Sequence, residues 1–125
     1  MPADRFTAKR KQAERQGRSG ETLAALLLRL KGYRILGRRV RTRAGEIDLI
    51  ARSPRGVLCF IEVKARPDMR AAIESVADRQ RARIVRAASA FIAGKPQLAR
   101  DRMRFDIVTV SPRALPRHIR DAWRP

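Results

Sequence analysis

The sequence predicts an α/β fold in which a mixed central sheet of four to five strands carries helices packed on its faces. Three observations lead to this prediction. The hydrophobic pattern passes from a helical period to three strand-like runs, then to a second helical period and a further strand. A tight turn joins the second and third strands and makes them antiparallel neighbours. The helix between the third and fourth strands lets those two run parallel through a right-handed crossover.

The first predicted element is a helix that starts at Ser19. Residues 1–18 form a basic N-terminal arm, and residues 19–125 form a single domain. Ser19 can act as N-cap, Glu21 lies in the first turn where the helix dipole favours a carboxylate, and Gly32 ends the helix. Its apolar stripe is Leu23, Leu26, Leu27 and Leu30, widened by Ala24, Ala25 and Leu28. We therefore expect this helix to be largely buried.

Strands and one more helix account for the rest of the chain. Three strands come next, over residues 33–42, 46–52 and 57–65. Gly37 is a candidate position for a bulge in the first of them. Helical periodicity then runs from residue 71 to about residue 93 and ends at Gly94. A fourth strand covers residues 103–110, and residues 118–123 add a short edge strand.

The turn between the second and third strands sets which side chains face each other. The turn reads Ser53, Pro54, Arg55, Gly56. This pattern fits a three-residue hairpin loop, a type I turn followed by a glycine bulge, with Ser53 paired to Val57. Counting along both strands away from the turn sets Asp48 opposite Glu62. The same face holds Glu46, Ile50, Arg52, Leu58, Phe60 and Lys64, and the opposite face holds Ile47, Leu49, Ala51, Cys59, Ile61 and Val63.

Asp48 opposite Glu62 is a costly arrangement unless a cation lies between them. Directly opposed side chains have Cβ atoms about 4.5–5.5 Å apart, where like charges are destabilising. Lys64 is one candidate cation and a divalent metal is the other, since carboxylate oxygens are the ligands that Mg²⁺ prefers. The alternative is a solvent-exposed pair with an ordinary Glu46–Lys64 salt bridge. Apolar neighbours on the same face favour the functional interpretation.

Composition indicates a basic, cytoplasmic protein that binds nucleic acid. Thirty Lys and Arg residues against twelve Asp and Glu give a formal charge of +18. A polyanionic partner is the first explanation, with nucleic acid ahead of a membrane surface. The single cysteine, Cys59, excludes an internal disulfide and fits a reducing compartment. The longest apolar run, residues 23–28, is far shorter than a membrane span, and we find no signal-peptide core.

The ordered acids and lysine resemble a known nuclease pattern. Glu21 on an early helix, Asp48 on a strand and Glu62-Val63-Lys64 on the next resemble the PD-(D/E)xK superfamily, whose restriction-endonuclease-like core is an αβββαβ unit. The segments GE, GYRIL, GEIDLIA, FIEVKAR and RFDIV are similar to the YraN-type family of uncharacterised bacterial proteins, which resemble archaeal Holliday-junction resolvases. The likeness runs from about Ser19 to Val110.

The resemblance implies a metal-dependent nuclease. Asp48 and Glu62 would hold Mg²⁺ or Mn²⁺, aided by the Val63 carbonyl, and Lys64 would orient or help to deprotonate the attacking water. The implied substrate is DNA, branched or structured, ahead of RNA, and cutting two strands would suit a homodimer. The alternatives are a catalytically silent nucleic-acid-binding protein that retains the nuclease fold, and a small basic adaptor with a vestigial acid cluster.

Two further residues are carried over with the resemblance, and two positions depart from it. Glu21 would assist at the metal; alternatively, it is only an acid in the first turn of the helix, where the helix dipole favours a carboxylate. Gln80 matches a position where related proteins have a polar residue near the site. Ile47 stands where the superfamily has proline. The segment after Lys64 lacks the expected Gly-Pro loop, so we expect a shorter or rearranged loop beside the site.

Other residues complete the predicted surface and core. His118, Cys59 and Asp106 are predicted to have structural roles, with Asp106 paired to Arg104 or Arg102, and Trp123 is predicted to dock on the domain. The arginines of the first strand and second helix are candidate phosphate contacts, with a solvated surface as the alternative. They are Arg38, Arg39, Arg41 and Arg43 on the strand and Arg79, Arg81, Arg83 and Arg86 on the helix.

Overall fold

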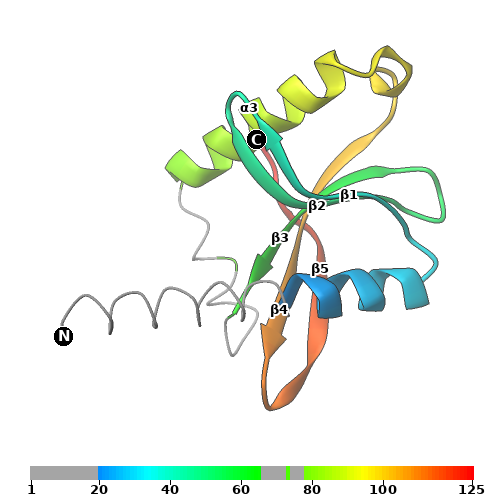
Figure 1. Ribbon diagram of the computed structural model, residues 1–125, viewed down its shortest axis with the longest axis vertical. Helices are drawn as coiled ribbons and strands as arrows, with labels where there is room; N and C mark the ends of the chain where they lie inside the picture. Colours follow the sequence, from blue (N-terminus) through cyan, green and yellow to red (C-terminus); the bar gives the residue numbers. More distant parts are fainter. Residues whose placement is uncertain (1–19, 66–72, 74–77) are drawn as a thin grey trace, which may run out of the picture.

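Five strands form one mixed sheet in the computed structural model of the chain (Figure 1). The structure describes residues 20–65, 73 and 78–125. The strands are β1 (Arg34–Thr42), β2 (Gly45–Arg52), β3 (Leu58–Lys64), β4 (Met103–Ser111) and β5 (Ala114–Trp123). They lie side by side in chain order; β3 and β4 are parallel, and the other neighbours are antiparallel. The predicted α/β fold is confirmed, and β5 is longer than the short edge strand predicted for the tail.

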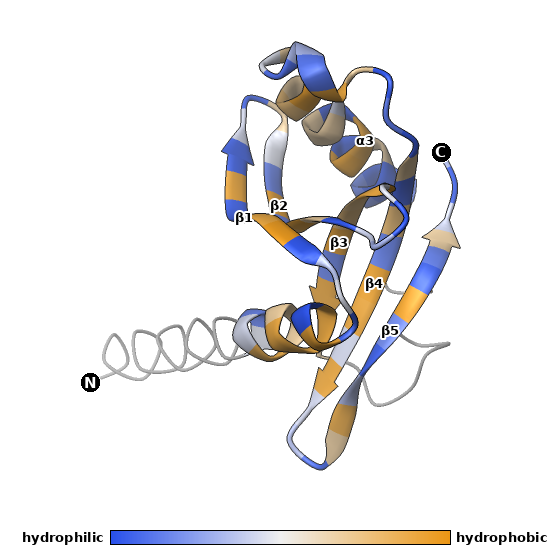
Figure 2. Cartoon of the chain, turned by 90° about the vertical axis from the view of Figure 1, so that its right-hand side faces the viewer, coloured by the Kyte–Doolittle hydropathy of each residue, from blue (hydrophilic) through white to orange (hydrophobic). Residues whose placement is uncertain are grey.

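Two helices pack on opposite faces of the sheet. The helix α3 (Asp78–Ala93) shares a core with Ile50 and Phe60, and the short helix η1 (Pro96–Leu98) follows it. A helix over residues 20–30 shares a second core with Leu49 and Ile61, which point to the other face because side chains alternate along a strand. In Figure 2 much of the hydrophobic colour lies on the central strands β3 and β4. Neither described helix is long and apolar enough to cross a membrane.

The hairpin between β2 and β3 has the predicted turn. The Ser53 N–H donates to the Val57 carbonyl at 2.8 Å, and the Gly56 N–H donates to the Ser53 carbonyl at 2.9 Å. Gly56 has a φ of +86°, which a glycine adopts without the steric cost of a Cβ atom. Ile50 pairs with Phe60, so the predicted register is confirmed from Arg52 to Leu49; the ladder does not extend to the predicted pair of Asp48 with Glu62. The β1–β2 ladder shifts at Gly37, where a bulge was predicted.

The 20–30 helix buries a different face from the one predicted. Its buried positions are Gly20, Glu21, Ala24, Ala25 and Leu28. Leu23, Leu26 and Leu30 are 45%, 52% and 78% exposed. A Cβ atom at Gly20 would lie 3.0 Å from Val110 Cγ2, so the helix approaches the sheet closely. Small residues permit that approach, and the bulkier leucines therefore face away from the sheet. The prediction of a buried leucine stripe is wrong. The predicted arm and the Ser19 cap lie outside the described residues.

Candidate metal centre

β2 separates from β3 at Asp48, and this opening creates the site. The β2–β3 pairing reaches Leu49 opposite Ile61. In a continued antiparallel ladder the Val63 N–H would meet the backbone of Ile47. The Val63 N–H instead donates to the Asp48 carboxylate, with 2.8 Å between N and Oδ2. The Asp48 side chain thus takes the place of a backbone acceptor beside β3.

The turn in β2 also moves Ile47 to the opposite core. Ile47 packs with Ile50 in the cluster beneath α3, whereas Leu49 packs against the 20–30 helix. On β1, Arg39 has a φ of +49°, a left-handed conformation that is uncommon for residues other than glycine. Val40 pairs with Ile47 and Arg38 pairs with Leu49, which sets Arg39 opposite Asp48. The prediction that Ile47 shares the Leu49 face is therefore wrong, because β2 does not continue as a regular strand through Asp48.

Three carboxylates converge beside this opening. One oxygen each from Glu21, Glu46 and Asp48 lies within 4.8 Å of the other two. Glu21 comes from the 20–30 helix, and Glu46 and Asp48 are two residues apart on β2. Glu46 was expected only as a partner of Lys64; its place two residues before Asp48 was the signal that could have assigned it here. These three residues, together with Glu62, are called the acid cluster below.

Glu62 joins the cluster through a hydrogen bond with Asp48. Its side chain is almost fully buried, and its Oε1 atom has no hydrogen-bond partner in the part of the chain that the structure describes. Burial, and then the charge and hydrogen bond of Asp48, raise the pKa of Glu62 to about 9. Without a cation, burial and the Asp48 carboxylate therefore favour the protonated form of Glu62. A divalent cation would favour its ionised form and occupy the orphaned oxygen.

Lys64 lies two residues beyond Glu62 on the same face of β3. It is half-buried, and its charge opposes the rise in the pKa of Glu62. The structure thus brings Lys64 close to the acid cluster. Gln80 lies in the first turn of α3, half-buried, and no described hydrogen bond joins it to the acids. The loop predicted to be shorter or rearranged falls mostly on residues outside the described part.

Arginines of β1 contact the acid cluster directly. The Arg39 Nε atom lies 3.0 Å from both carboxylate oxygens of Glu21. Burial raises the pKa of Glu21, and the hydrogen bond from Arg39 opposes that rise without cancelling it. The Arg41 Nε atom is 3.6 Å from Glu46, although the Arg41 side chain is 89% exposed. These two guanidinium groups therefore form a cationic rim beside the carboxylates.

The remaining predicted arginines lie around this rim or on exposed surface. The Arg38 Nη2 atom donates to the Thr22 hydroxyl at 2.9 Å. Arg83 on α3 lies over Gly45, since a Cβ atom there would be 3.3 Å from its Cγ and Cδ atoms. Arg43 and Arg79 are exposed. Two elements far apart in the sequence thus place arginines near Glu46.

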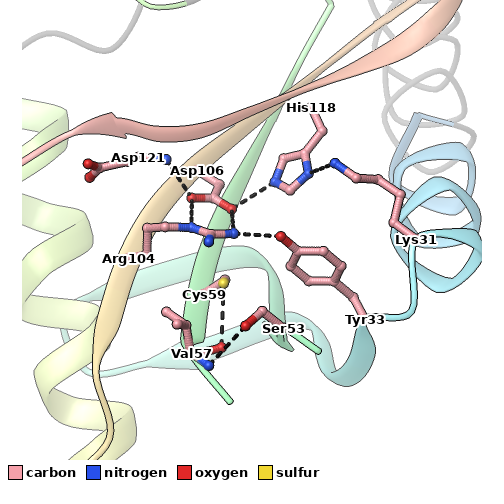
Figure 3. Close-up of polar contacts among 9 residues, drawn as sticks. All are labelled: Lys31, Tyr33, Ser53, Val57, Cys59, Arg104, Asp106, His118 and Asp121. Atoms are coloured by element: carbon pink, nitrogen blue, oxygen red, sulfur yellow. Dashed lines mark hydrogen bonds and ion pairs between the residues drawn. The ribbon is translucent and has the colours of Figure 1, made fainter. Parts of the chain in front are cut away.

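A second polar cluster is buried between β4 and β5 (Figure 3). Asp106 is fully buried and accepts hydrogen bonds from Arg104 Nε, Arg104 Nη2 and His118 Nε2 at 2.8, 2.8 and 2.7 Å. The Asp121 N–H adds a fourth at 3.0 Å. Although burial alone would raise the pKa of Asp106, the hydrogen bonds from His118 and Arg104 hold it below its ordinary value. The predicted Asp106–Arg104 pair is confirmed, and His118 has a structural contact.

Cys59 and Trp123 also lie where the sequence predicted. Cys59 is fully buried, and this burial raises the pKa of its thiol to about 12, which disfavours the reactive thiolate at neutral pH. Trp123 stacks on Phe105 with ring centroids 4.3 Å apart. Both side chains therefore belong to the structural core.

The fold and the acid cluster define an α/β protein with an αβββαβ core and carboxylates that could hold a metal ion. The chain belongs to the uncharacterised protein family UPF0102, which matches residues 20–110 and confirms the predicted YraN-type resemblance. It is 51% identical to a UPF0102 protein of Parvibaculum lavamentivorans, over 90% of this chain and 84% of the relative. A relative from Paramagnetospirillum magneticum is 53% identical, over 90% and 89%. One from Agrobacterium fabrum is 47% identical, over 98% and 100%.

Proposed function

We propose that this protein is a metal-dependent nuclease of the PD-(D/E)xK type that hydrolyses phosphodiester bonds in DNA, with branched or structured DNA preferred. The observation that carries the proposal is the convergence of Glu21, Glu46 and Asp48 beside the buried Glu62, which contacts Asp48 and has a carboxyl oxygen without a described partner. A chain of charge +18 has many cations, yet these four acids lie together where β2 leaves β3. Burial and the charge of Asp48 disfavour the ionised form of Glu62, and a bound divalent cation would offset both effects.

The donor set suits Mg²⁺ or Mn²⁺. All the candidate side-chain ligands are carboxylates, the ligand type that these hard cations prefer. Asp48 and Glu62 would hold the ion, with the Val63 carbonyl as a further ligand and Glu21 and Glu46 beside it. A bound ion would polarise a phosphate oxygen and lower the pKa of a water molecule.

The chain's own cations would position the substrate. Lys64, beside Glu62, would orient the attacking water and stabilise negative charge that develops on the phosphate. Arg39 and Arg41 would hold neighbouring phosphates, since a guanidinium group can make two parallel hydrogen bonds to phosphate oxygens. Because Arg39 is already tied to Glu21, phosphate binding at Arg39 would loosen that pair.

The test is cleavage of labelled branched, single-stranded and duplex DNA, and of RNA, with Mg²⁺ or Mn²⁺. Asp48→Asn and Lys64→Ala should each abolish cleavage. Asp121→Asn is the matched carboxylate control, because Asp121 is exposed on β5, pairs with Arg124 and has a φ of +52° that asparagine tolerates. Lys95→Ala is the matched lysine control, because Lys95 is exposed beyond α3. Both controls should cleave at the wild-type rate.

The second candidate function is nucleic-acid binding without turnover. The Arg39–Glu21 ion pair favours it, because a protein cation already neutralises one of the acids. Tight, salt-sensitive binding with no cleavage under either metal would establish this alternative and overturn the nuclease proposal. Preferential cleavage of RNA would retain the chemistry and correct the substrate.

A further inference from the structure

A cavity of about 780 Å³ lies at the other end of β3 from the acid cluster. Its lining comes from the β2–β3 turn, from the segment that leads into β4, and from β4 and β5. Glu62 lies five residues along the chain from Val57, which lines the cavity, and this separation corresponds to about 16 Å at roughly 3.3 Å per residue. We call this cavity the arginine pocket; its arginines are Arg55, Arg100, Arg102, Arg104 and Arg120.

Most of the positive charge in the arginine pocket has no counter-charge. Asp101 is the one acid among the described lining residues, and it pairs with Arg52 at 2.9 Å. Arg104 is held by Asp106. The other four arginines are exposed and have no carboxylate partner within the described ranges. Four unpaired guanidinium groups around one hollow repel each other, and this repulsion is relieved when a polyanion binds.

An apolar hollow of about 420 Å³ adjoins the arginine pocket. The two cavities share Val57, Arg102 and Arg104, and the second extends over Met103 to Trp123. Met103 is 52% exposed, so an apolar side chain lies open beside the arginines. A phosphate group held by the arginines would place its sugar or base over this hollow. The combination matches a nucleotide unit better than a bare inorganic anion.

We propose that the arginine pocket is a second binding site for a nucleic-acid backbone, distinct from the acid cluster and about 16 Å from it along β3. A strand that leaves the acid cluster along the sheet would be held here through its phosphates. The inference rests on the nucleic-acid partner of the proposed function and does not require cleavage. Substrates long enough to reach both sites should bind more tightly than short ones.

Trp123 offers a built-in probe of this site. It is the single tryptophan of the chain and lines the adjoining hollow. Titration of the full chain with single-stranded and branched DNA, in EDTA to prevent cleavage, should change its fluorescence. The double variant Arg102→Gln/Arg120→Gln should lose this change and bind at least tenfold more weakly at about 0.1 M salt. Its log-log salt slope should fall by about 1.4 on single strands if two phosphates are released.

The matched control is Arg29→Gln/Arg113→Gln, which removes the same charge from exposed positions on the 20–30 helix and in the β4–β5 turn. It should keep the fluorescence change. A second pocket variant, Arg55→Gln/Arg100→Gln, should repeat the loss if the first variant fails to fold, as judged by circular dichroism. Equal affinity and fluorescence response in the pocket and control variants would overturn the proposal. A response to inorganic pyrophosphate with none to DNA would also overturn it, in favour of a small-anion site.

The two proposals fail in different ways. If Asp48→Asn and the wild type both lack cleavage but keep the Trp123 response, the nuclease proposal fails and the arginine pocket stands. If the wild type cleaves and the pocket variants bind and cleave at the control level, the pocket fails and the nuclease stands.

Discussion

Glu62 combines burial with a neighbouring negative charge, and this combination lowers the stability of the metal-free protein. Its pKa is raised from 4.5 to about 9, so across that range the folded protein holds a proton that the unfolded chain has released. The unfolded state then binds fewer protons, and the free energy of unfolding falls as pH rises. The group that would bind the metal thus opposes folding at neutral pH.

We therefore expect Glu62→Gln to stabilise the metal-free protein. Glutamine has the shape of the protonated acid, can donate to Asp48 and never ionises. The gain should be about 1–2 kcal/mol at pH 7 and should grow as pH rises through the window from 4.5 to about 9. Urea unfolding in EDTA at several pH values measures it. A variant less stable than the wild type throughout that window would contradict the shifted pKa.

In the hydrogen-bond network around Asp106, we expect a substitution to lower the stability of the protein. Tyr33 accepts a hydrogen bond of 2.7 Å from Arg104 Nη2, and its ring contacts His118 edge-on at 5.3 Å between centroids. Tyr33→Phe should cost about 1–2 kcal/mol, because it removes an acceptor from a half-buried guanidinium group and keeps the ring contact. The urea midpoint measures the loss. An unchanged midpoint would mean that water replaces the hydroxyl without cost.

At the scale of elements, the 20–30 helix shows how packing selects a face. The sequence predicted that leucines at helical spacing point inward, and the structure buries Gly20, Ala24 and Ala25 with Leu28 instead. Periodicity indicates that such a helix is amphipathic, but several apolar stripes were available around this one. The distance between helix and sheet decided among them, and that distance is a tertiary quantity.

The difference between the predicted and observed buried faces of the helix can be tested with two leucine substitutions. Leu28→Ala should destabilise the protein by about 2–4 kcal/mol, because Leu28 is fully buried and its loss leaves a cavity. Leu26→Ala should change stability by less than about 0.5 kcal/mol, because its side chain is half exposed. Chemical unfolding of the two variants decides between the faces. Equal costs would mean that the leucine stripe is covered in solution.

In the β2–β3 hairpin, by contrast with the 20–30 helix, local sequence predicts the structure. Ser53, Pro54, Arg55 and Gly56 fix the turn type, and the turn fixes the register up to Leu49 opposite Ile61. These are interactions between residues close in sequence, so the sequence predicts them well. On the side of Leu49 away from the hairpin turn, β2 changes direction. Local sequence pattern predicts neither the position of Ile47 there nor the convergence of Glu46 with Glu21. Contacts with β1, α3 and the 20–30 helix decide both.

At the scale of the whole molecule, we expect metal binding to increase the free energy of unfolding. A ligand that binds only the folded state adds about 2.7 kcal/mol at one hundred times its dissociation constant. Mn²⁺ should therefore raise the melting temperature of the wild type, and EDTA should reverse the increase. Asp48→Asn should show little of this increase, whereas Asp121→Asn should keep it. An equal shift in both variants would place the metal elsewhere.

The sequence by itself determined the order of elements, the hairpin register from Arg52 to Leu49 and the strong positive charge, because each depends on residue type, periodicity or a local turn. Only the tertiary structure decided that β2 leaves β3 at Asp48, that Glu46 joins Glu21 there, and that four arginines without a carboxylate partner among the described residues surround one hollow at the far end of β3. These features arise where segments distant in sequence pack together, and the packing distances that set them are not encoded in any single segment.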